Sequence, residues 1–236
     1  MFKVTLTNEI LKYITAIDQN RYALSAVKLS RVVTNRLRKN SKKKSAYAST
    51  KIEGNPLSEK QVDEVIERDE RKHYLKPEQE VRNYFLALNY LEEKVKQKEK
   101  FSKELILDVQ KYVEKGAARE KIGLRRQMPP GVLFAVYDSH SGNPEYIPPE
   151  YIDVPALLDE LVDYVNTTDD HPLIIAAVVH YQLVTIHPFE DGNGRTARLL
   201  SSYILDINGY GFQGIGSLEE YFAYDIGYII APIFNA

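Results

Sequence analysis

Apolar side chains recur at helical spacing along most of the chain. In the first such region, about residues 8–39, Ile10, Leu11 and Ile14 lie three or four positions apart, which is typical of a helix with one buried face. A second apolar stripe follows Pro77, a residue that suits the first turn of a helix. The repeated spacing predicts a mainly helical protein.

Polar residues that cap helices indicate where the shorter helices begin. Ser58, with Gln61 three residues later, forms a capping box, and we expect the helix that it opens to end near Arg68. Other helices are predicted to begin at Ser102, at Asp153 with Pro155, and at Ser217 with Glu220.

The most apolar helix is predicted in the second half of the chain. Asp170 and Pro172 open the run LIIAAVVHYQLVTI, which is apolar on almost every side and therefore indicates a buried central helix. This helix must end at His187, because Pro188 disfavours helical geometry in the residue before it. The next helix is expected to begin after Gly194.

One segment, residues 123–149, interrupts the helices. The run VLFAVY at 132–137, the turn-rich DSHSGNP and then EYI predict a β-hairpin. The predicted fold class is therefore all-α with one inserted hairpin. We expect a single domain over 1–236, with an N-terminal helical region at about 1–70 and a core at about 71–236.

Composition narrows the class of protein further. With 44% hydrophobic and 27% charged residues, the chain resembles an ordinary globular protein, and its net charge of −2 gives no overall attraction to nucleic acid or membrane. The absence of cysteine excludes disulfides and thiolate catalysis. The N-terminus lacks a signal-peptide pattern, and the longest apolar run, Leu173–Val179, is too short to span a bilayer. We expect a soluble, cytoplasmic protein.

The basic run RLRKNSKKK at 36–44 has two interpretations. It could bind nucleic acid or an acidic partner. Alternatively, it is the solvated end of the first helix, where positive charge is favourable. We prefer the second interpretation, because no recognition-helix pattern accompanies the run.

The candidate chemistry lies in residues 187–198, HPFEDGNGRTAR. A Gly-rich turn here precedes a helix, and the free N–H groups at a helix N-terminus bind anions. Gly192 and Gly194 let the backbone approach a ligand closely. Arg195 and Arg198 lie three residues apart, so both can face a phosphate from one side of the helix.

Two further side chains in this segment extend the interpretation. Asp191 is a hard oxygen ligand beside the expected phosphate site and suits Mg²⁺. His187 titrates near neutral pH and could accept a proton from a hydroxyl. Each of these features alone is more often structural, since a histidine before proline, a Gly-Asn-Gly turn and surface arginines are all common. Together they indicate attack of a hydroxyl on a nucleotide phosphate.

Residues 187–198 match the motif H-P-F-x-D/E-G-N-G-R-x-x-R at every fixed position, so the chain resembles the Fic family. The resemblance extends over about residues 48–224 and includes the Tyr-Ile-Pro-Pro segment at 146–149. It implies a helical enzyme that transfers AMP from ATP to a Ser, Thr or Tyr hydroxyl of a target protein. The hairpin would be a flap along which that target binds as an added strand.

The resemblance also implies residue roles. His187 would be the general base, Asp191 would hold Mg²⁺ on the ATP phosphates, and Phe189 would anchor the loop in the core. The phosphate contacts would come from Gly192, Asn193 and Gly194 as an anion hole, from Arg195, and from Arg198 at the γ-phosphate. The related Doc-type kinases have lysine in place of Gly194, so the glycine favours AMP transfer.

Upstream, the segment STKIEGN at 49–55 resembles the family's inhibitory motif, S/T-x-x-x-E-G/N. The resemblance implies that Ser49, Glu53 and Gly54 lie on an N-terminal inhibitory helix and that Glu53 pairs with Arg198. Gly54 could also simply end a helix, and both interpretations can hold.

Several alternatives remain open at this stage. The same site could remove AMP from a target, with Glu53 positioning a water, or the chain could be a regulatory module that senses nucleotide without turnover. The target, the modified residue type and a possible homo-oligomer are not determined. The apolar segment at 228–234 could pack on the core, dock on another subunit or mark a shortened chain.

Overall fold

The computed structural model describes residues 2, 4–68, 73–116, 121–132, 134–137 and 143–224. Around the hairpin turn, His140 and the rest of 138–142 lie outside the described residues, as does the apolar segment at 228–234. The elements in chain order are α1 (Asn8–Ser25), α2 (Arg31–Ile52), α3 (Glu59–Glu67), α4 (Lys76–Gln97), α5 (Lys103–Val113), β1 (Val136–Tyr137), β2 (Pro144–Tyr146), α6 (Val154–Thr167), α7 (Pro172–Ile186), α8 (Asn193–Ile207), a 3-10 turn (Phe212–Gly214) and α9 (Leu218–Tyr224).

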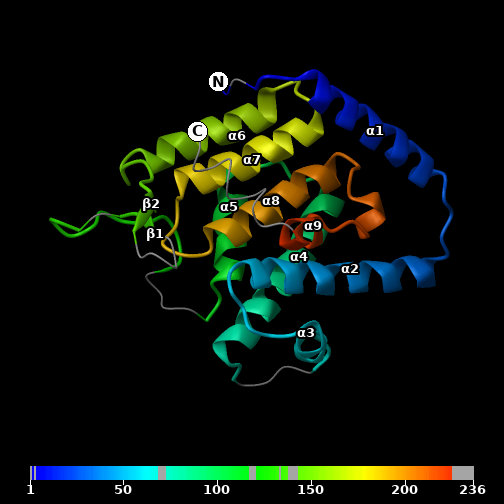
Figure 1. Ribbon diagram of the computed structural model, residues 1–236, viewed down its shortest axis with the longest axis horizontal. Coiled ribbons are helices and arrows are strands. Elements are labelled where there is room, and N and C mark those ends of the chain that lie inside the picture. The colour runs from blue at the N-terminus through cyan, green and yellow to red at the C-terminus, as the bar shows by residue number, and fades with distance from the viewer. Residues whose placement is uncertain are drawn as a thin grey trace.

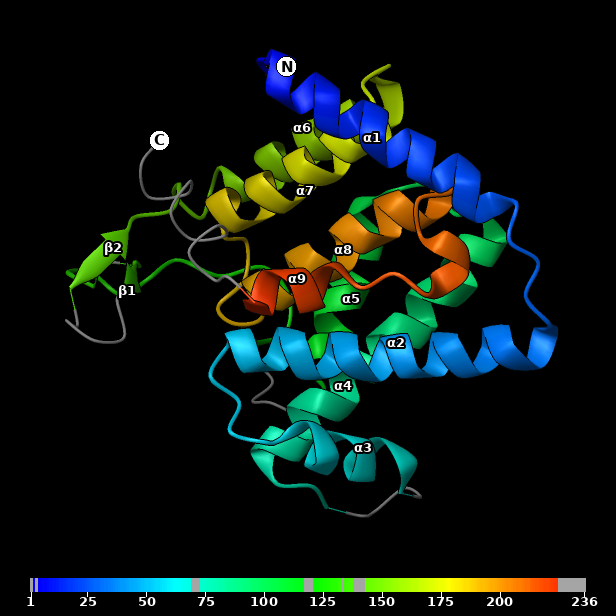
Figure 2. The ribbon, with the colours of Figure 1, turned by 45° about the vertical axis from the view of Figure 1, so that its right-hand side comes forward.

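The described chain is a helical assembly with one small hairpin, as predicted. Helices α7 and α8 pack closely against each other in its middle, and α2, α4 and α5 surround α8 (Figures 1 and 2). Their apolar faces share one core, in which the side chains of Leu199 and Leu200 are fully buried. No helix in the described part of the chain has both the length and the apolar character that a membrane crossing requires.

The predicted first helical region, residues 8–39, is wrong in extent. It contains two helices, because Ser30 adopts extended geometry and its hydroxyl accepts a hydrogen bond from Val33 N, which starts α2 as a separate helix. Helix α2 then continues to Ile52, well beyond the predicted end. Its course along one side of the molecule, apart from α1, is visible in Figure 2.

The basic run at 36–44 therefore lies in the middle of α2, not at a helix end. Its lysines contact carboxylates of three other helices: Lys42 pairs with Glu92 of α4, Lys43 Nζ lies 2.8 Å from Glu67 of α3, and Lys44 Nζ lies 2.9 Å from Glu220 of α9. Because these charges are satisfied within the protein, the run docks α2. Neither of the two interpretations made from the sequence predicted that the basic run docks α2 on its neighbours.

Most predicted helix starts agree with the structure. The capping box of Ser58 and Gln61 is present, with Ser58 N donating to Gln61 Oε1 over 2.9 Å. Two starts differ by one or two residues. His171 rather than Asp170 caps α7, since its ring accepts from Leu173 N, and α8 begins at Asn193, immediately after Gly192.

The hairpin is shorter than the predicted strand at 132–137. Strand β1 holds two residues and pairs antiparallel with β2, with Val136 opposite Tyr146. The preceding Phe134 packs its ring over Arg125 instead of extending the strand. Tyr146 donates to the Thr185 carbonyl over 2.8 Å, which holds the hairpin beside the C-terminal end of α7.

The burial of α8 makes a direct prediction for stability. Leu199→Ala should lower the free energy of unfolding by about 2–5 kcal/mol, because a fully buried leucine leaves a cavity when truncated. Leu11→Ala is the matched control, since Leu11 is 46% exposed on α1, and it should cost much less. Urea denaturation of both variants measures the difference, and equal losses would contradict the assigned core.

Candidate functional site

The site forms where α7 ends and the chain reverses into α8. His187 caps α7 in the left-handed region, with φ 48° and ψ 59°, which is uncommon for a residue other than glycine. The first helical hydrogen bond of α8 runs from Thr196 N to Gly192 O over 2.9 Å. The N–H groups of Asn193, Gly194 and Arg195 precede this bond and point out of the helix start, as an anion site requires.

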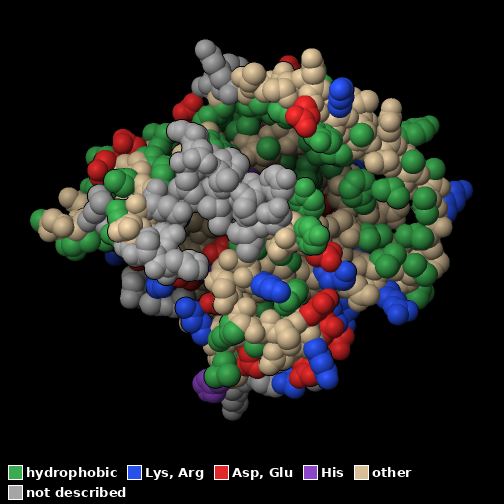
Figure 3. All heavy atoms as spheres, viewed as in Figure 1, with side chains coloured by type: hydrophobic (Ala, Val, Ile, Leu, Met, Phe, Trp, Pro, Cys, Tyr) green, Lys and Arg blue, Asp and Glu red, His purple; other side chains and the backbone are tan. Residues whose placement is uncertain are grey.

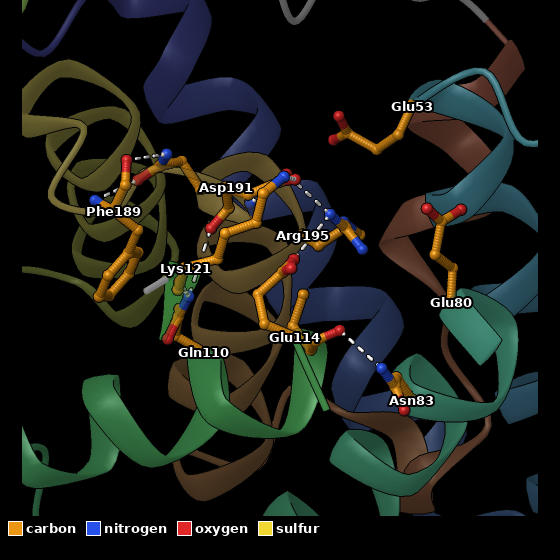
Figure 4. A network of polar contacts seen from close by, with 12 residues as sticks. Glu53, Glu80, Asn83, Gln110, Glu114, Lys121, Phe189, Asp191 and Arg195 are labelled. Carbon is orange, nitrogen blue, oxygen red and sulfur yellow. Dashed lines mark hydrogen bonds and ion pairs between the residues drawn. The ribbon is translucent and has the colours of Figure 1, made fainter. Parts of the chain in front are cut away.

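Asn193 closes the loop between the two helices. Its side-chain Oδ1 accepts from Phe189 N over 3.0 Å, and its Nδ2 donates to Phe189 O over 2.9 Å (Figure 4). Phe189 is 1% exposed, so it anchors the loop in the core, as predicted. The side chain of Asn193 is thus committed to the loop, which leaves its backbone N–H as the group that can reach an anion.

Both motif glycines lie where a side chain would clash. Gly192 has φ 81°, and a Cβ there would lie 2.9 Å from Glu114 Oε1. A Cβ on Gly194 would lie 2.6 Å from Glu53 Oε1 and 3.1 Å from an Arg198 nitrogen. The sequence pattern predicts that both glycines allow the close approach of a ligand. The structure adds two protein neighbours, Glu114 and Glu53, which cap the C-terminal ends of α5 and α2.

Asp191 and Arg195 form the centre of a charged network (Figure 4). Arg195 lies 3.1 Å from Asp191 Oδ1 and 3.0 Å from Glu114 Oε1, while Lys121 Nζ lies 3.1 Å from Asp191 Oδ2. Burial acts to raise the pKa of Asp191, but Lys121, Arg195 and the Gly192 N–H outweigh it and lower that pKa. Asp191 is therefore ionised at neutral pH.

Burial instead raises the pKa of Glu114, with Arg195 opposing and Asp191 adding to the rise. This carboxyl is buried and faces one of the two buried arginines of α8. The arginines were considered as possible surface residues, and the structure contradicts that alternative. Each guanidinium is enclosed and held by acceptors from other elements.

A divalent cation would have one clear protein ligand here. No three His, Asp or Glu side chains converge as a metal-binding group within the described ranges. Asp191 nevertheless fits Mg²⁺, because this ion commonly takes one or two carboxylates and completes its shell with water and substrate phosphates. The helix start beside Asp191 is where such phosphates would lie.

Arg198 is 3% exposed and binds the end of α2. Its Nε donates to Ser49 Oγ over 2.8 Å, and one terminal nitrogen donates to Ser49 O over 3.1 Å and to Glu53 Oε1 over 2.6 Å. Gly54 follows with φ 83° and donates its N–H to Lys51 O, so it ends the helix as well. The structure thus brings Ser49 and Glu53 of the upstream motif against Arg198 of the downstream motif.

His187 lies beside this network and is held by Arg125. Arg125 Nε donates to the His187 carbonyl over 2.9 Å, and Arg125 N donates to Pro188 O over 2.9 Å. The His187 ring packs edge-on to Phe134 at 6.0 Å between centroids. Its Nδ1 is buried and the Val184 carbonyl lies near the ring, which leaves Nε2 as the nitrogen open to an incoming group.

The pKa of His187 is lowered, and burial is the main cause. The nearby Val184 carbonyl, Glu53 and Asp191 act to raise it, while Arg125 acts with burial. The lowered pKa keeps the imidazole neutral at pH 7, so it can accept a proton.

Four residues of the site were not identified from the sequence: Gln110, Glu114, Lys121 and Arg125. Gln110 is fully buried, donates to Lys121 O over 2.8 Å and accepts from Gly123 N over 3.1 Å. Gln110 of α5 and Glu114, the C-cap of this helix, are four residues apart and lie on the same side of it. That spacing was visible in the sequence, but nothing local indicated that this face meets residues 187–198.

Comparison with known proteins agrees with this geometry. Residues 100–205 match the Fic/DOC family. The protein adenylyltransferase Fic of Drosophila grimshawi is 30% identical over 205 residues, which cover 84% of this chain and 40% of the fly protein. This chain thus spans about two fifths of that relative's length.

Solved structures agree in fold. A Fic family protein from Desulfovibrio desulfuricans G20 superposes with a TM-score of 0.76 at 26% identity, covering 94% of this chain and 64% of that one. A Fic domain containing signaling protein from Bacteroides thetaiotaomicron gives a TM-score of 0.73 at 22% identity, with 92% and 80% covered.

The environment of His187 makes a prediction for its titration. In an NMR titration the ring should have a midpoint below the ordinary value of about 6.5, because burial disfavours the charged form. Glu53→Gln should lower the midpoint further, since it removes a negative charge that favours protonation. Glu190→Gln, at an exposed position of the same loop, is the control and should leave the midpoint in place. A midpoint at or above about 6.5 would contradict the assigned environment.

Proposed function

This chain belongs to the Fic/DOC family, and on that premise we propose that it transfers AMP from ATP to a Ser, Thr or Tyr hydroxyl of a target protein and is inhibited in cis by Glu53. The observation that supports the proposal best is that α8 carries both the expected phosphate site and the arginine that Glu53 occupies. Its first turn offers free N–H groups and Arg195, while Arg198 one turn later is occupied by Ser49 and Glu53 of α2.

In the proposed reaction the nucleotide phosphates bind at the start of α8. The N–H groups of residues 193–195 donate to phosphate oxygens, and the glycines at 192 and 194 keep this approach open. Arg195 adds a charge-assisted hydrogen bond. Asp191 would hold Mg²⁺, which neutralises phosphate charge when bound.

His187 then serves as the general base. The target hydroxyl oxygen bonds to the α-phosphorus, the bond from that phosphorus to the leaving oxygen breaks, and pyrophosphate departs. The hydroxyl proton moves to His187 Nε2, which is neutral at pH 7 because burial lowers the pKa of the ring. Arg125 positions the base through its hydrogen bond to the His187 carbonyl.

Glu53 acts as the inhibitory residue because it occupies the group that would hold the γ-phosphate. A hydrogen bond to a charged group contributes about 1.5–3 kcal/mol, and the lower end applies because the Glu53 side chain is 40% exposed. Competition of that size weakens the productive binding of ATP about tenfold. ATP can still bind, with its phosphates displaced from the position required for attack.

The position of Gly194 favours AMP transfer over phosphoryl transfer. A Cβ at this residue would lie 2.6 Å from Glu53 Oε1 and 3.1 Å from an Arg198 nitrogen, so the lysine of the Doc-type kinases would displace the Glu53–Arg198 pair. The hairpin offers a short strand edge beside His187, along which a target segment would bind by main-chain hydrogen bonds.

Removal of AMP is the second candidate. The Glu53 carboxylate acts to raise the pKa of His187, so it lies close enough to influence the base and could orient a water near it. Release of AMP from a modified target, lost in Glu53→Gln, would identify this activity.

The proposed inhibition makes a prediction for self-modification. Glu53→Gly should raise AMP transfer at least about tenfold, because Arg198 becomes free for the γ-phosphate. Adding His187→Ala should reduce the rate by about 10²–10⁴-fold, the usual loss of a general base. Intact mass after incubation with Mg²⁺ and ATP is the measurement, since each transfer adds one AMP.

Lys51→Gly is the matched control for this experiment. Lys51 is exposed in the last turn of α2, so its replacement adds the same glycine to the helix end and leaves Glu53 in place. Equal activation by both variants would show that loosening α2, and not loss of the carboxylate, releases the enzyme. An unchanged rate in Glu53→Gly would refute the inhibitory role.

A further inference from the structure

A cavity of about 660 Å³ lies between α2, α4, α8 and the segment at 209–218. Figure 3 shows a hollow with hydrophobic side chains around it beside α1, on this side of the molecule. Of the described residues that line the cavity, none belongs to the loop and helix start at 187–198. Its volume is that of a typical small-molecule pocket.

The lining combines apolar walls with one carboxylate that has no partner. Leu88, Leu205 and Phe212 contribute apolar surface, and Asp206 faces the same space. The Asp206 carboxylate packs so closely on Gly211 that a Cβ there would overlap it. It makes no hydrogen bond or ion pair with any residue that the structure describes.

The other carboxylates of the lining are satisfied. Glu92 pairs with Lys42 and with Lys96, and Glu219 accepts a hydrogen bond from Tyr84 over 2.9 Å. Asp206 itself is exposed, and the charged side chains that act on it are Glu219, Glu92 and Lys42. Because Asp206 is exposed to the cavity and has no ion-pair partner in the described chain, its charge is open to a cationic ligand.

We propose that this cavity binds a small organic amine, whose ammonium group pairs with Asp206 and whose apolar part contacts Leu205 and Phe212. A ligand of this kind matches both properties of the lining. A metal ion does not, since it would leave the apolar walls uncovered, and an anion would face an unpaired carboxylate.

The cavity and the nucleotide site share one face of α2. Arg38, Lys42 and Ser45 line the cavity, and Ser49 and Glu53 continue the same face at three- to four-residue spacing. Ser45 Oγ bonds to Ser217 Oγ over 2.8 Å at the cavity end. At the other end Ser49 and Glu53 hold Arg198.

Because α2 contacts both places, we infer that binding of the amine changes the inhibition by Glu53. This part of the inference rests on the proposed function. The cavity exists in the arrangement in which Glu53 occupies Arg198. We expect the amine to bind this arrangement more tightly than one in which α2 has moved away from Arg198, and such a preference strengthens inhibition.

Binding is tested with hexylamine as the probe and 1-hexanol as its uncharged analogue. Calorimetric titration should show hexylamine binding the wild type more tightly than 1-hexanol. Asp206→Asn should weaken hexylamine binding by about ten- to a hundredfold, because the charge-assisted pair is lost. Asp169→Asn, at an exposed position between α6 and α7, is the control and should bind as the wild type does.

Thermal unfolding without ligand shows whether Asp206→Asn is folded, and removal of an unpaired carboxylate should not destabilise it. Equal hexylamine affinity in wild type and folded Asp206→Asn would overturn the proposed site.

Coupling is tested by the initial rate of AMP transfer with and without hexylamine. The amine should lower the rate of the wild type about fivefold or more and leave Glu53→Gln unchanged, since that variant lacks the inhibitory carboxylate. Equal effects on both, or none on either while binding is intact, would overturn the coupling. Absence of transfer in every variant would instead refute the proposed function, while Asp206-dependent amine binding would still establish the site.

Discussion

Arg195 and Arg198 are buried on α8, and a buried guanidinium is costly unless acceptors surround it. Arg195 takes its acceptors from Glu114 of α5 and from Asp191 of the loop, and Arg198 takes its acceptors from the last turn of α2. These demands determine which elements must pack around α8. They also place two positive charges beside a helix start whose N–H groups are free.

The same demand explains how one residue, Arg198, would serve both nucleotide binding and inhibition in the proposed function. Arg198 requires an anion, and either a carboxylate from α2 or a nucleotide phosphate meets that need. Helix α2 can supply the carboxylate because Lys42, Lys43 and Lys44 tie its middle to α4, α3 and α9. In the proposed function, the inhibitory end of α2 is therefore positioned by ion pairs on the same helix, about three turns before Glu53.

Asp206 shows the opposite situation at the far end of α8. Its carboxylate is exposed to a cavity and makes no ion pair within the described chain, so solvent and not protein surrounds it. Paired carboxylates in this molecule hold helices together. An unpaired one in a roomy, partly apolar space is the arrangement expected of a ligand site.

The sequence by itself determined the helical class, the loop between α7 and α8 and the residues that lie at the start of α8. These depend on short-range signals: Pro188 after His187, glycines at a turn, and apolar spacing. The sequence did not predict the break between α1 and α2, which the cap at Ser30 produces. It also predicted too long a first strand, because Phe134 packs on Arg125 instead of joining β1. The roles of Gln110, Glu114 and Arg125, the docking of the basic run, and the isolation of Asp206 were decided only by tertiary structure. Each of them depends on residues that are distant in the sequence. No local pattern specifies which helix face will lie opposite a given side chain, or whether that face will carry a charge.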